Sequence, residues 1–132
     1  MQRKSADVVV AGVGPGGLYA ALEALKRGLS VHIFDKKEVV GLPVKCGEYF
    51  PVRKEMEYLL PDATDHMHVF DVPQEAVDNV CKTIRVISPK GREFEFDFEA
   101  YVLDRTTLEQ RLAEQVEALG GTIQLRTPVD LF

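Results

Sequence analysis

The sequence has 132 residues, 45% of them hydrophobic, and this length and composition are typical of one small globular domain. Its 16 basic and 21 acidic side chains give a net charge of −5, which argues against a nucleic-acid-binding surface. The most apolar stretch, residues 8–11, is far shorter than the ~20 residues of a transmembrane segment. Two cysteines, Cys46 and Cys81, are too few for a disulfide framework, so we expect a cytoplasmic protein.

The first 35 residues carry the pattern of a strand, a tight turn, a helix and a second strand. The β-branched run Asp7–Gly12 is typical of a buried parallel strand. Apolar residues at i, i+3, i+4 and i+7 from Leu18 predict a helix that ends at Gly28. Val31–Asp35 then has the composition of a second strand. Together these elements predict a βαβ unit.

The later elements are less regular, and a hairpin is the clearest of them. Phe94, Phe96 and Phe98 alternate with acidic residues, so this arm is predicted to have one apolar and one polar face. In chain order we expect a loop over Gly41–Pro51, a short helix over Arg53–Leu60, a turn-rich stretch over Pro61–Gln74, hairpin arms over Thr83–Ser88 and Glu93–Phe98, a helix from Arg105 to Gly120, and a strand over Thr122–Arg126. This order predicts an α/β, Rossmann-like domain with a parallel sheet and an inserted antiparallel β-hairpin.

A glycine-rich motif lies between the first strand and the first helix. Gly12, Gly14 and Gly17 have the spacing G-x-G-x-x-G, in which the glycines allow a sharp turn, a close approach to a pyrophosphate, and helix–strand packing. The pyrophosphate is expected at the helix N-terminus. Asp35, at the end of the second strand, is expected to bind the adenosine ribose hydroxyls and to disfavour NADP. The motif does not separate FAD from NAD, and a glycine-rich turn of another α/β fold is the alternative.

A second motif resembles that of a known enzyme family. Residues 41–48 read Gly-Leu-Pro-Val-Lys-Cys-Gly-Glu and are similar to the G-x-P-x-[RK]-C-G-E loop of the geranylgeranyl reductase family of FAD-dependent enzymes. That family also has the glycine-rich motif and a Leu-Asp-Arg segment that opens a helix, here residues 103–105. The resemblance covers most of residues 6–130 and extends to flavoproteins with a p-hydroxybenzoate-hydroxylase-like fold. It implies an oxidoreductase of isoprenoid lipid biosynthesis that reduces isoprenoid double bonds with reduced FAD.

The resemblance also implies which residues contact FAD. Arg105 is expected near the phosphates and Val129 near the adenine. A cation at a helix start opposes the helix dipole, which a nearby phosphate would explain, although an ion pair with Asp104 or Glu109 is the alternative. The full expected set is Gly12, Gly14, Gly16, Gly17, Asp35, Cys46, Gly47, Tyr49, Arg105 and Val129.

Cys46 is a candidate catalytic residue, since the neighbouring cation of Lys45 favours a reactive thiolate. The alternative is that Cys46 is a small residue that fits beneath a flat ring.

His66 and His68 have acidic neighbours but no further ligand cluster, so we expect a polar loop there and no metal site.

The organisation of the whole protein is also an expectation from the resemblance. The family continues into a Gly-Asp motif and a substrate domain, so we expect residues 1–132 to be an incomplete N-terminal FAD-binding domain without its substrate domain. Whether this chain catalyses a reaction stays open, as do two alternatives: a fragment of a flavin monooxygenase or halogenase, and a non-catalytic dinucleotide-binding module. The expected substrate of the full protein is an isoprenoid or other apolar small molecule, with the electron donor unidentified. A peripheral position at a membrane is the alternative to a purely cytoplasmic one.

Overall fold

The computed structural model of the chain describes residues 5–46 and 48–130. The chain divides into two compact units. The first comprises Met1–Val44 and Arg105–Phe132, and the second comprises Lys45–Asp104.

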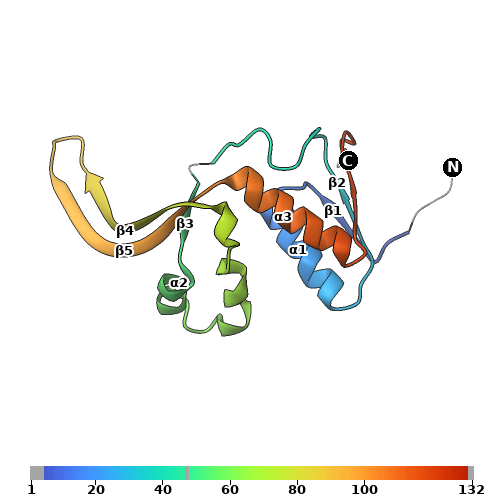
Figure 1. Cartoon of the computed structure of the whole chain (residues 1–132), viewed down its shortest axis with the longest axis horizontal. Coiled ribbons are helices and arrows are strands. Elements are labelled where there is room, and N and C mark those ends of the chain that lie inside the picture. The colour runs from blue at the N-terminus through green and yellow to red at the C-terminus, as the bar shows by residue number, and fades with distance from the viewer. Residues whose placement is uncertain (1–4, 47, 131–132) are drawn as a thin grey trace. The chain divides into compact units, whose positions relative to one another are not determined.

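The first unit contains a parallel sheet covered by two helices, which confirms the predicted fold class. The strand order is β1-β2-β6, with β1 and β6 on either side of β2. Helices α1 and α3 pack against each other over this sheet (Figure 1). The bounds are β1 (Val8–Ala11), α1 (Pro15–Lys26), β2 (Val31–Phe34), α3 (Arg105–Ala118) and β6 (Thr122–Gln124).

The core of the first unit explains why these segments take these positions. Val31 and Ile33 alternate toward the helices and are fully buried on β2. Leu18 from α1 and Leu108 from α3 are buried with them, as their helical spacing predicts. Leu119, at the far end of the α3 stripe, is instead 51% exposed, because the helix ends at Ala118.

The second unit contains a three-stranded antiparallel sheet in the order β3-β5-β4, together with short helices. Its elements are β3 (Tyr49–Pro51), α2 (Arg53–Leu59), the 3-10 helices η1 (Thr64–Phe70) and η2 (Gln74–Ala76), β4 (Val77–Ile87) and β5 (Glu93–Leu103). The loop predicted over Gly41–Pro51 is therefore wrong at its end, because Tyr49–Pro51 pairs with β5.

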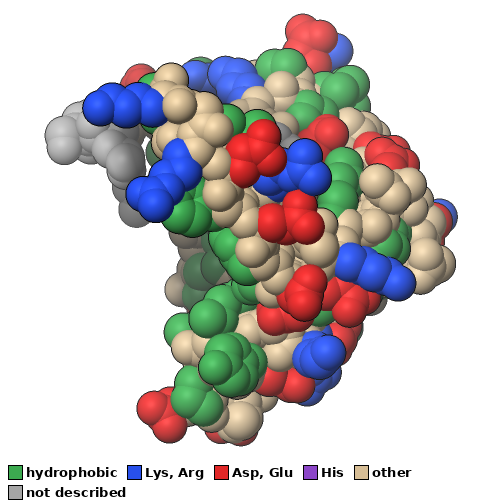
Figure 2. All heavy atoms as spheres, turned by 90° about the vertical axis from the view of Figure 1, so that its left-hand side faces the viewer, with side chains coloured by type: hydrophobic (Ala, Val, Ile, Leu, Met, Phe, Trp, Pro, Cys, Tyr) green, Lys and Arg blue, Asp and Glu red, His purple; other side chains and the backbone are tan. Residues whose placement is uncertain are grey.

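The hairpin is also longer than predicted. β4 begins at Val77, whereas the sequence predicted an arm that starts at Thr83. The register of β4 is irregular between Val77 and Asn79 and between Cys81 and Thr83, which interrupts the alternating pattern by which a strand is predicted. The alternation of faces in β5 is confirmed, since Val86 pairs with Phe94. The side chains of this apolar face remain partly exposed to solvent, and that of Phe94 is 51% exposed. Figure 2 looks from the hairpin side and shows hydrophobic, acidic and basic side chains at the surface.

Candidate functional site

A pocket of about 350 Å3 lies in the first unit, at the carboxyl ends of β1 and β2. It brings together three residues that the sequence analysis selected: Gly12, Asp35 and Val129. Ligands of open parallel sheets bind at this end of the strands. The complete lining is Ala11, Gly12, Phe34, Asp35, Lys36, Pro128, Val129 and Asp130.

The glycine-rich turn forms one side of this pocket. Gly12 has a φ of 113°, a left-handed conformation that favours glycine, and its amide donates to the Phe34 carbonyl at 2.8 Å. A Cβ on Gly17 would overlap the Gly12 carbonyl oxygen, so the third glycine is required for the helix to pack against the turn. A Cβ on Gly14 or Gly16 would meet nothing within 4 Å. These two glycines thus leave the backbone accessible from outside.

The start of α1 is suited to an anion. Its N-cap is Gly14, no side chain caps it, and its first turn holds no acidic residue. The first amides of a helix have no intrahelical acceptor, and Pro15 removes one of them at no cost. The amides of Gly16 and Gly17 and the positive end of the helix dipole therefore provide the electrostatics that a pyrophosphate needs. On this observation the residues fit the pyrophosphate of a dinucleotide.

Asp35 is held in place by two backbone amides. Its carboxylate accepts hydrogen bonds from the amide of Val13 at 2.6 Å and from the amide of Lys37 at 2.7 Å. Burial opposes ionisation of this carboxyl, but the two amides and the charges of Lys37 and Lys36 outweigh it, so the pKa of Asp35 lies below its ordinary value. The carboxylate is therefore ionised at neutral pH, and it also ties the glycine-rich turn to the end of β2.

The segment after β6 places Val129 beside Asp35. The amide of Arg126 donates to the Lys37 carbonyl at 2.9 Å, and the amide of Thr127 donates to the Asp35 carbonyl at 2.8 Å. The Thr127 hydroxyl donates to the Leu125 carbonyl at 3.0 Å. These bonds continue the pairing of β2 with β6 beyond both strands, so Val129, which is 42% exposed, lines the pocket.

Arg105 is the first residue of α3, and its guanidinium forms an ion pair within that helix. Its Nη2 lies 2.8 Å from Oε1 of Glu109, one of the two partners that the sequence analysis named. The pair is not on the surface, since the two side chains are only 16% and 7% exposed. Lys37 approaches the same carboxylate, with Nζ at 3.8 Å from Oε2.

The other expected residues lie in the second unit or outside the described residues. Cys46 is exposed. Gly47 falls outside the described residues. Tyr49 is the first residue of β3, and burial together with the charges of Cys81 and Glu55 raises the pKa of its hydroxyl. The structure therefore does not relate these three residues to the pocket.

Sequence reasoning missed several residues of the site. Lys36 and Asp130 line the pocket, and only their position next to Asp35 and Val129 could have indicated this. The approach of Lys37 to Glu109 was not predicted, because the two residues are far apart in the sequence.

Within residues 5–46 and 48–130, no group of three or more His, Cys, Asp or Glu side chains is placed to hold a metal ion. No helix in this described part is long and apolar enough to cross a membrane.

The chain is similar to several known proteins. Residues 7–47, which include the glycine-rich turn and Asp35, match the family model of an FAD-binding domain. An uncharacterized protein in the nifH2 5′ region of Methanosarcina barkeri is 36% identical over 95% of this chain and 67% of its own length. The digeranylgeranylglycerophospholipid reductase of Methanosarcina acetivorans is 33% identical over 92% of this chain, and that of Methanocella arvoryzae is 29% identical over 92%.

Two solved structures are also similar to this chain. A geranylgeranyl bacteriochlorophyll reductase-like protein from Thermoplasma acidophilum is 27% identical and superposes with a TM-score of 0.73 over 93% of this chain. A myxobacterial halogenase, at 19% identity and a TM-score of 0.67, shares the fold. The chain spans 28% and 30% of the length of the two reductases named above, and 30% of the Thermoplasma protein. Residues 7–47 thus match an FAD-binding domain, and the chain as a whole is similar to geranylgeranyl reductase-like flavoproteins.

Proposed function

We propose that this chain binds FAD as part of an oxidoreductase that reduces the double bonds of isoprenoid lipids. The observation that carries the proposal is the pocket that joins Gly12, Asp35 and Val129 beside the uncapped start of α1. The names of its relatives support the substrate class, since two of them are reductases of digeranylgeranylglycerophospholipid. We also propose that residues 1–132 act together as one FAD-binding domain of a larger protein.

Asp35, Val129 and the start of α1 have separate parts in holding the cofactor. The amides at the start of α1 bind the pyrophosphate, and the ionised carboxylate of Asp35 accepts hydrogen bonds from the ribose hydroxyls. Val129 packs against the adenine. FAD supplies the two-electron chemistry, and the protein supplies binding, orientation and electrostatics.

Three further residues enter the proposal through the family motif. Cys46, Gly47 and Tyr49 belong to the segment that we assign to the flavin side of the cofactor. Cys46 is the candidate for a direct part in catalysis, and its exposure in the second unit leaves its thiol accessible. Replacement by serine separates the two roles, because serine keeps the small size but is a poor nucleophile near neutral pH. A Cys46→Ser protein that binds FAD normally and keeps its reductase activity supports contact by size alone, whereas normal FAD binding with lost activity supports a direct part in catalysis.

The related flavin monooxygenases and halogenases are the second candidate class. Their likeness to this chain is one of fold, at 19% identity for the myxobacterial halogenase and the p-nitrophenol 4-monooxygenase. The higher identity of the reductases, up to 33%, favours the reductase assignment.

The experiment that tests the proposal is a titration of the 132-residue chain with FAD, followed by calorimetry and by the visible spectrum of the bound flavin. Asp35→Ala removes a charged acceptor, and hydrogen bonds to charged groups contribute about 1.5–3 kcal/mol, so its Kd for FAD should rise by about 10-fold to 100-fold. Because Asp35 also binds Val13 and Lys37, circular dichroism must show that the variant is folded. Tighter binding of NAD than of FAD would contradict the cofactor assignment, and unchanged FAD affinity in the folded variant would contradict the role of Asp35.

A further inference from the structure

We infer that Glu109 is a positioning residue for FAD: its buried carboxylate holds the guanidinium of Arg105 in the orientation in which Arg105 binds the FAD phosphates. This inference rests on the proposed function, because it takes FAD as the ligand and Arg105 as a phosphate contact. It assigns a role to a side chain that neither the glycine-rich motif nor the Cys-Gly-Glu loop includes.

Glu109 is placed where the fold alone would favour an apolar residue. It is 5% exposed and follows Leu108 in the core-facing part of α3, where Leu112 and Val116 are also buried. Burying a carboxylate is costly even when it is paired, and apolar residues of similar volume often replace buried ion pairs without loss of stability. The position of Glu109 is therefore explained better by what its charge holds than by packing.

The charge of Glu109 joins the start of α3 to the segment after β2, whose Lys36 lines the pocket. Its Oε1 accepts from Nη2 of Arg105 at 2.8 Å, and its Oε2 lies 3.8 Å from Nζ of Lys37. The amide of Lys37 in turn donates to the carboxylate of Asp35 at 2.7 Å. A continuous series of contacts therefore leads from the proposed ribose contact to the proposed phosphate contact, all within the first unit.

The cluster of Arg105, Glu109 and Lys37 contains polar atoms whose hydrogen bonding is not satisfied within it. Nε of Arg105 and Oε2 of Glu109 are buried and have no hydrogen-bond partner among the described residues. Arginine has five N–H donors in a planar fork, so a guanidinium held on one side by a carboxylate still presents donors to a phosphate. The series contains two cations, Arg105 and Lys37, and two carboxylates, Glu109 and Asp35, so the attraction for a phosphate is assigned to the N–H donors of Arg105 and not to a net charge.

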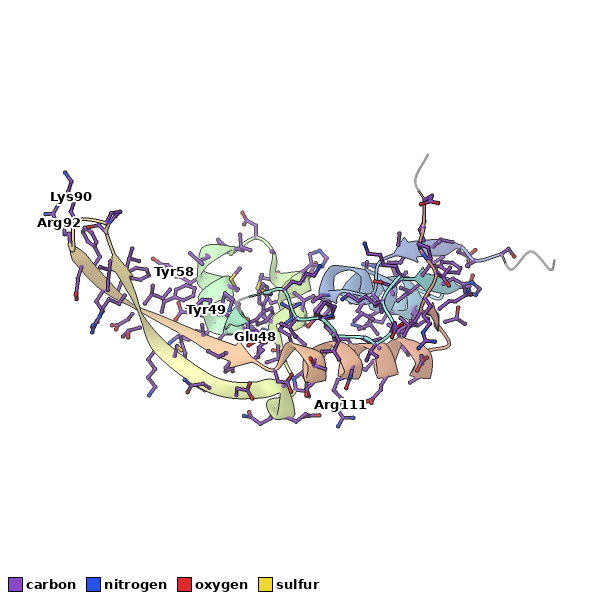
Figure 3. The ribbon with its side chains drawn as sticks, turned by 90° about the horizontal axis from the view of Figure 1, so that it is seen from above. Glu48, Tyr49, Tyr58, Lys90, Arg92 and Arg111 are labelled. Atoms are coloured by element: carbon purple, nitrogen blue, oxygen red, sulfur yellow. The ribbon has the colours of Figure 1, made fainter. Side chains whose placement is uncertain are left out.

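A matched pair of variants on the same helix tests this inference. Glu109→Gln keeps the size of the side chain and one acceptor oxygen but removes the charge that holds Arg105. Glu114→Gln makes the same change in the pair Arg111–Glu114, whose atoms are also 2.8 Å apart but whose side chains are 49% and 62% exposed. Figure 3 shows Arg111 projecting away from α3. Each variant is titrated by calorimetry with FAD and, separately, with adenosine, which has no phosphate.

We expect the Kd of Glu109→Gln for FAD to rise by about 10-fold or more, since a charge-assisted contact is weakened, while its Kd for adenosine stays as in the original chain. Glu114→Gln should change neither value. In a chain that already carries Arg105→Gln, Glu109→Gln should have no further effect on FAD binding, because the two residues act as one unit.

The inference is overturned if Glu109→Gln binds FAD as tightly as the original chain, or if it loses FAD and adenosine affinity equally, which is the result of a purely structural role. If Glu109→Gln does not fold, Glu109→Asp decides: it keeps the charge but shifts the carboxylate, so FAD affinity should fall and adenosine affinity should not. Unchanged FAD affinity in Glu109→Asp then overturns the inference. An original chain that binds no FAD refutes the proposed function itself, which distinguishes the two failures.

Discussion

Gly17 and Gly16 are adjacent glycines for which the structure predicts opposite effects of the same substitution. A Cβ on Gly17 would overlap the Gly12 carbonyl oxygen and lie 3.1 Å from Cγ1 of Val10. The oxygen belongs to the backbone and cannot turn aside, so the start of α1 must move away from Gly12 by about 1.5 Å to reach an ordinary contact of ~3.5 Å. Overpacking of this kind costs about 2–3 kcal/mol, which lowers Tm by about 8–12 °C in a domain of this size.

Gly16→Ala is the matched control, because a Cβ there meets nothing within 4 Å. Alanine is the better helix former by about 0.5–1 kcal/mol, so Tm should stay the same or rise. The assay is thermal unfolding followed by far-UV circular dichroism, with FAD titration of the folded variants. Gly16→Ala should lose FAD affinity despite its stability, since the added methyl lies where the pyrophosphate is proposed to bind. A Gly17→Ala chain as stable as the original would refute the close packing of α1 on the turn.

Two further predictions concern the segments that hold the site. Because the pKa of Asp35 is lower in the folded chain than its ordinary 3.8, its carboxylate stabilises the fold fully above that value, and this contribution is lost as the pH falls through the lowered pKa. The difference in urea midpoint between the original chain and Asp35→Asn should therefore shrink from pH 7 to about pH 3, and an unchanged difference would count against the two amide contacts. Gly41→Ala should destabilise the chain by about 1–3 kcal/mol in the same urea assay. Gly41 has a φ of 82°, and a Cβ there would lie 2.8 Å from Cα of Thr106. Equal urea midpoints of the original chain and Gly41→Ala would contradict this close contact.

The βαβ unit could be predicted from the sequence because local patterns determine it. The run of valines in β1, the glycine spacing and the helical stripe from Leu18 each indicate one element, and all agree. The role of Asp35 as a ribose contact could be proposed from its position directly after β2. These signals do not depend on any distant residue.

The remaining features depend on contacts between distant segments. β3 has only three residues and ends in Pro51, so its pairing with β5 gives no local signal. The irregular register near Cys81 hides the start of β4 from a period-two pattern. The approach of Lys37 to Glu109 arises only when α3 packs beside the segment after β2. The sequence did indicate Glu109 as a partner of Arg105, since the two lie one helical turn apart.

The central claim is that FAD occupies the pocket at the carboxyl ends of β1 and β2. Its most direct test is the ¹⁵N–¹H correlation spectrum of the 132-residue chain with and without FAD, in which each backbone amide is a separate probe. We predict that the amides of Gly14, Gly16, Gly17, Asp35 and Val129 shift on addition of FAD, while those of the exposed face of α3 around Glu114 do not. Shifts confined to other parts of the chain, with these five amides unchanged, would contradict the account.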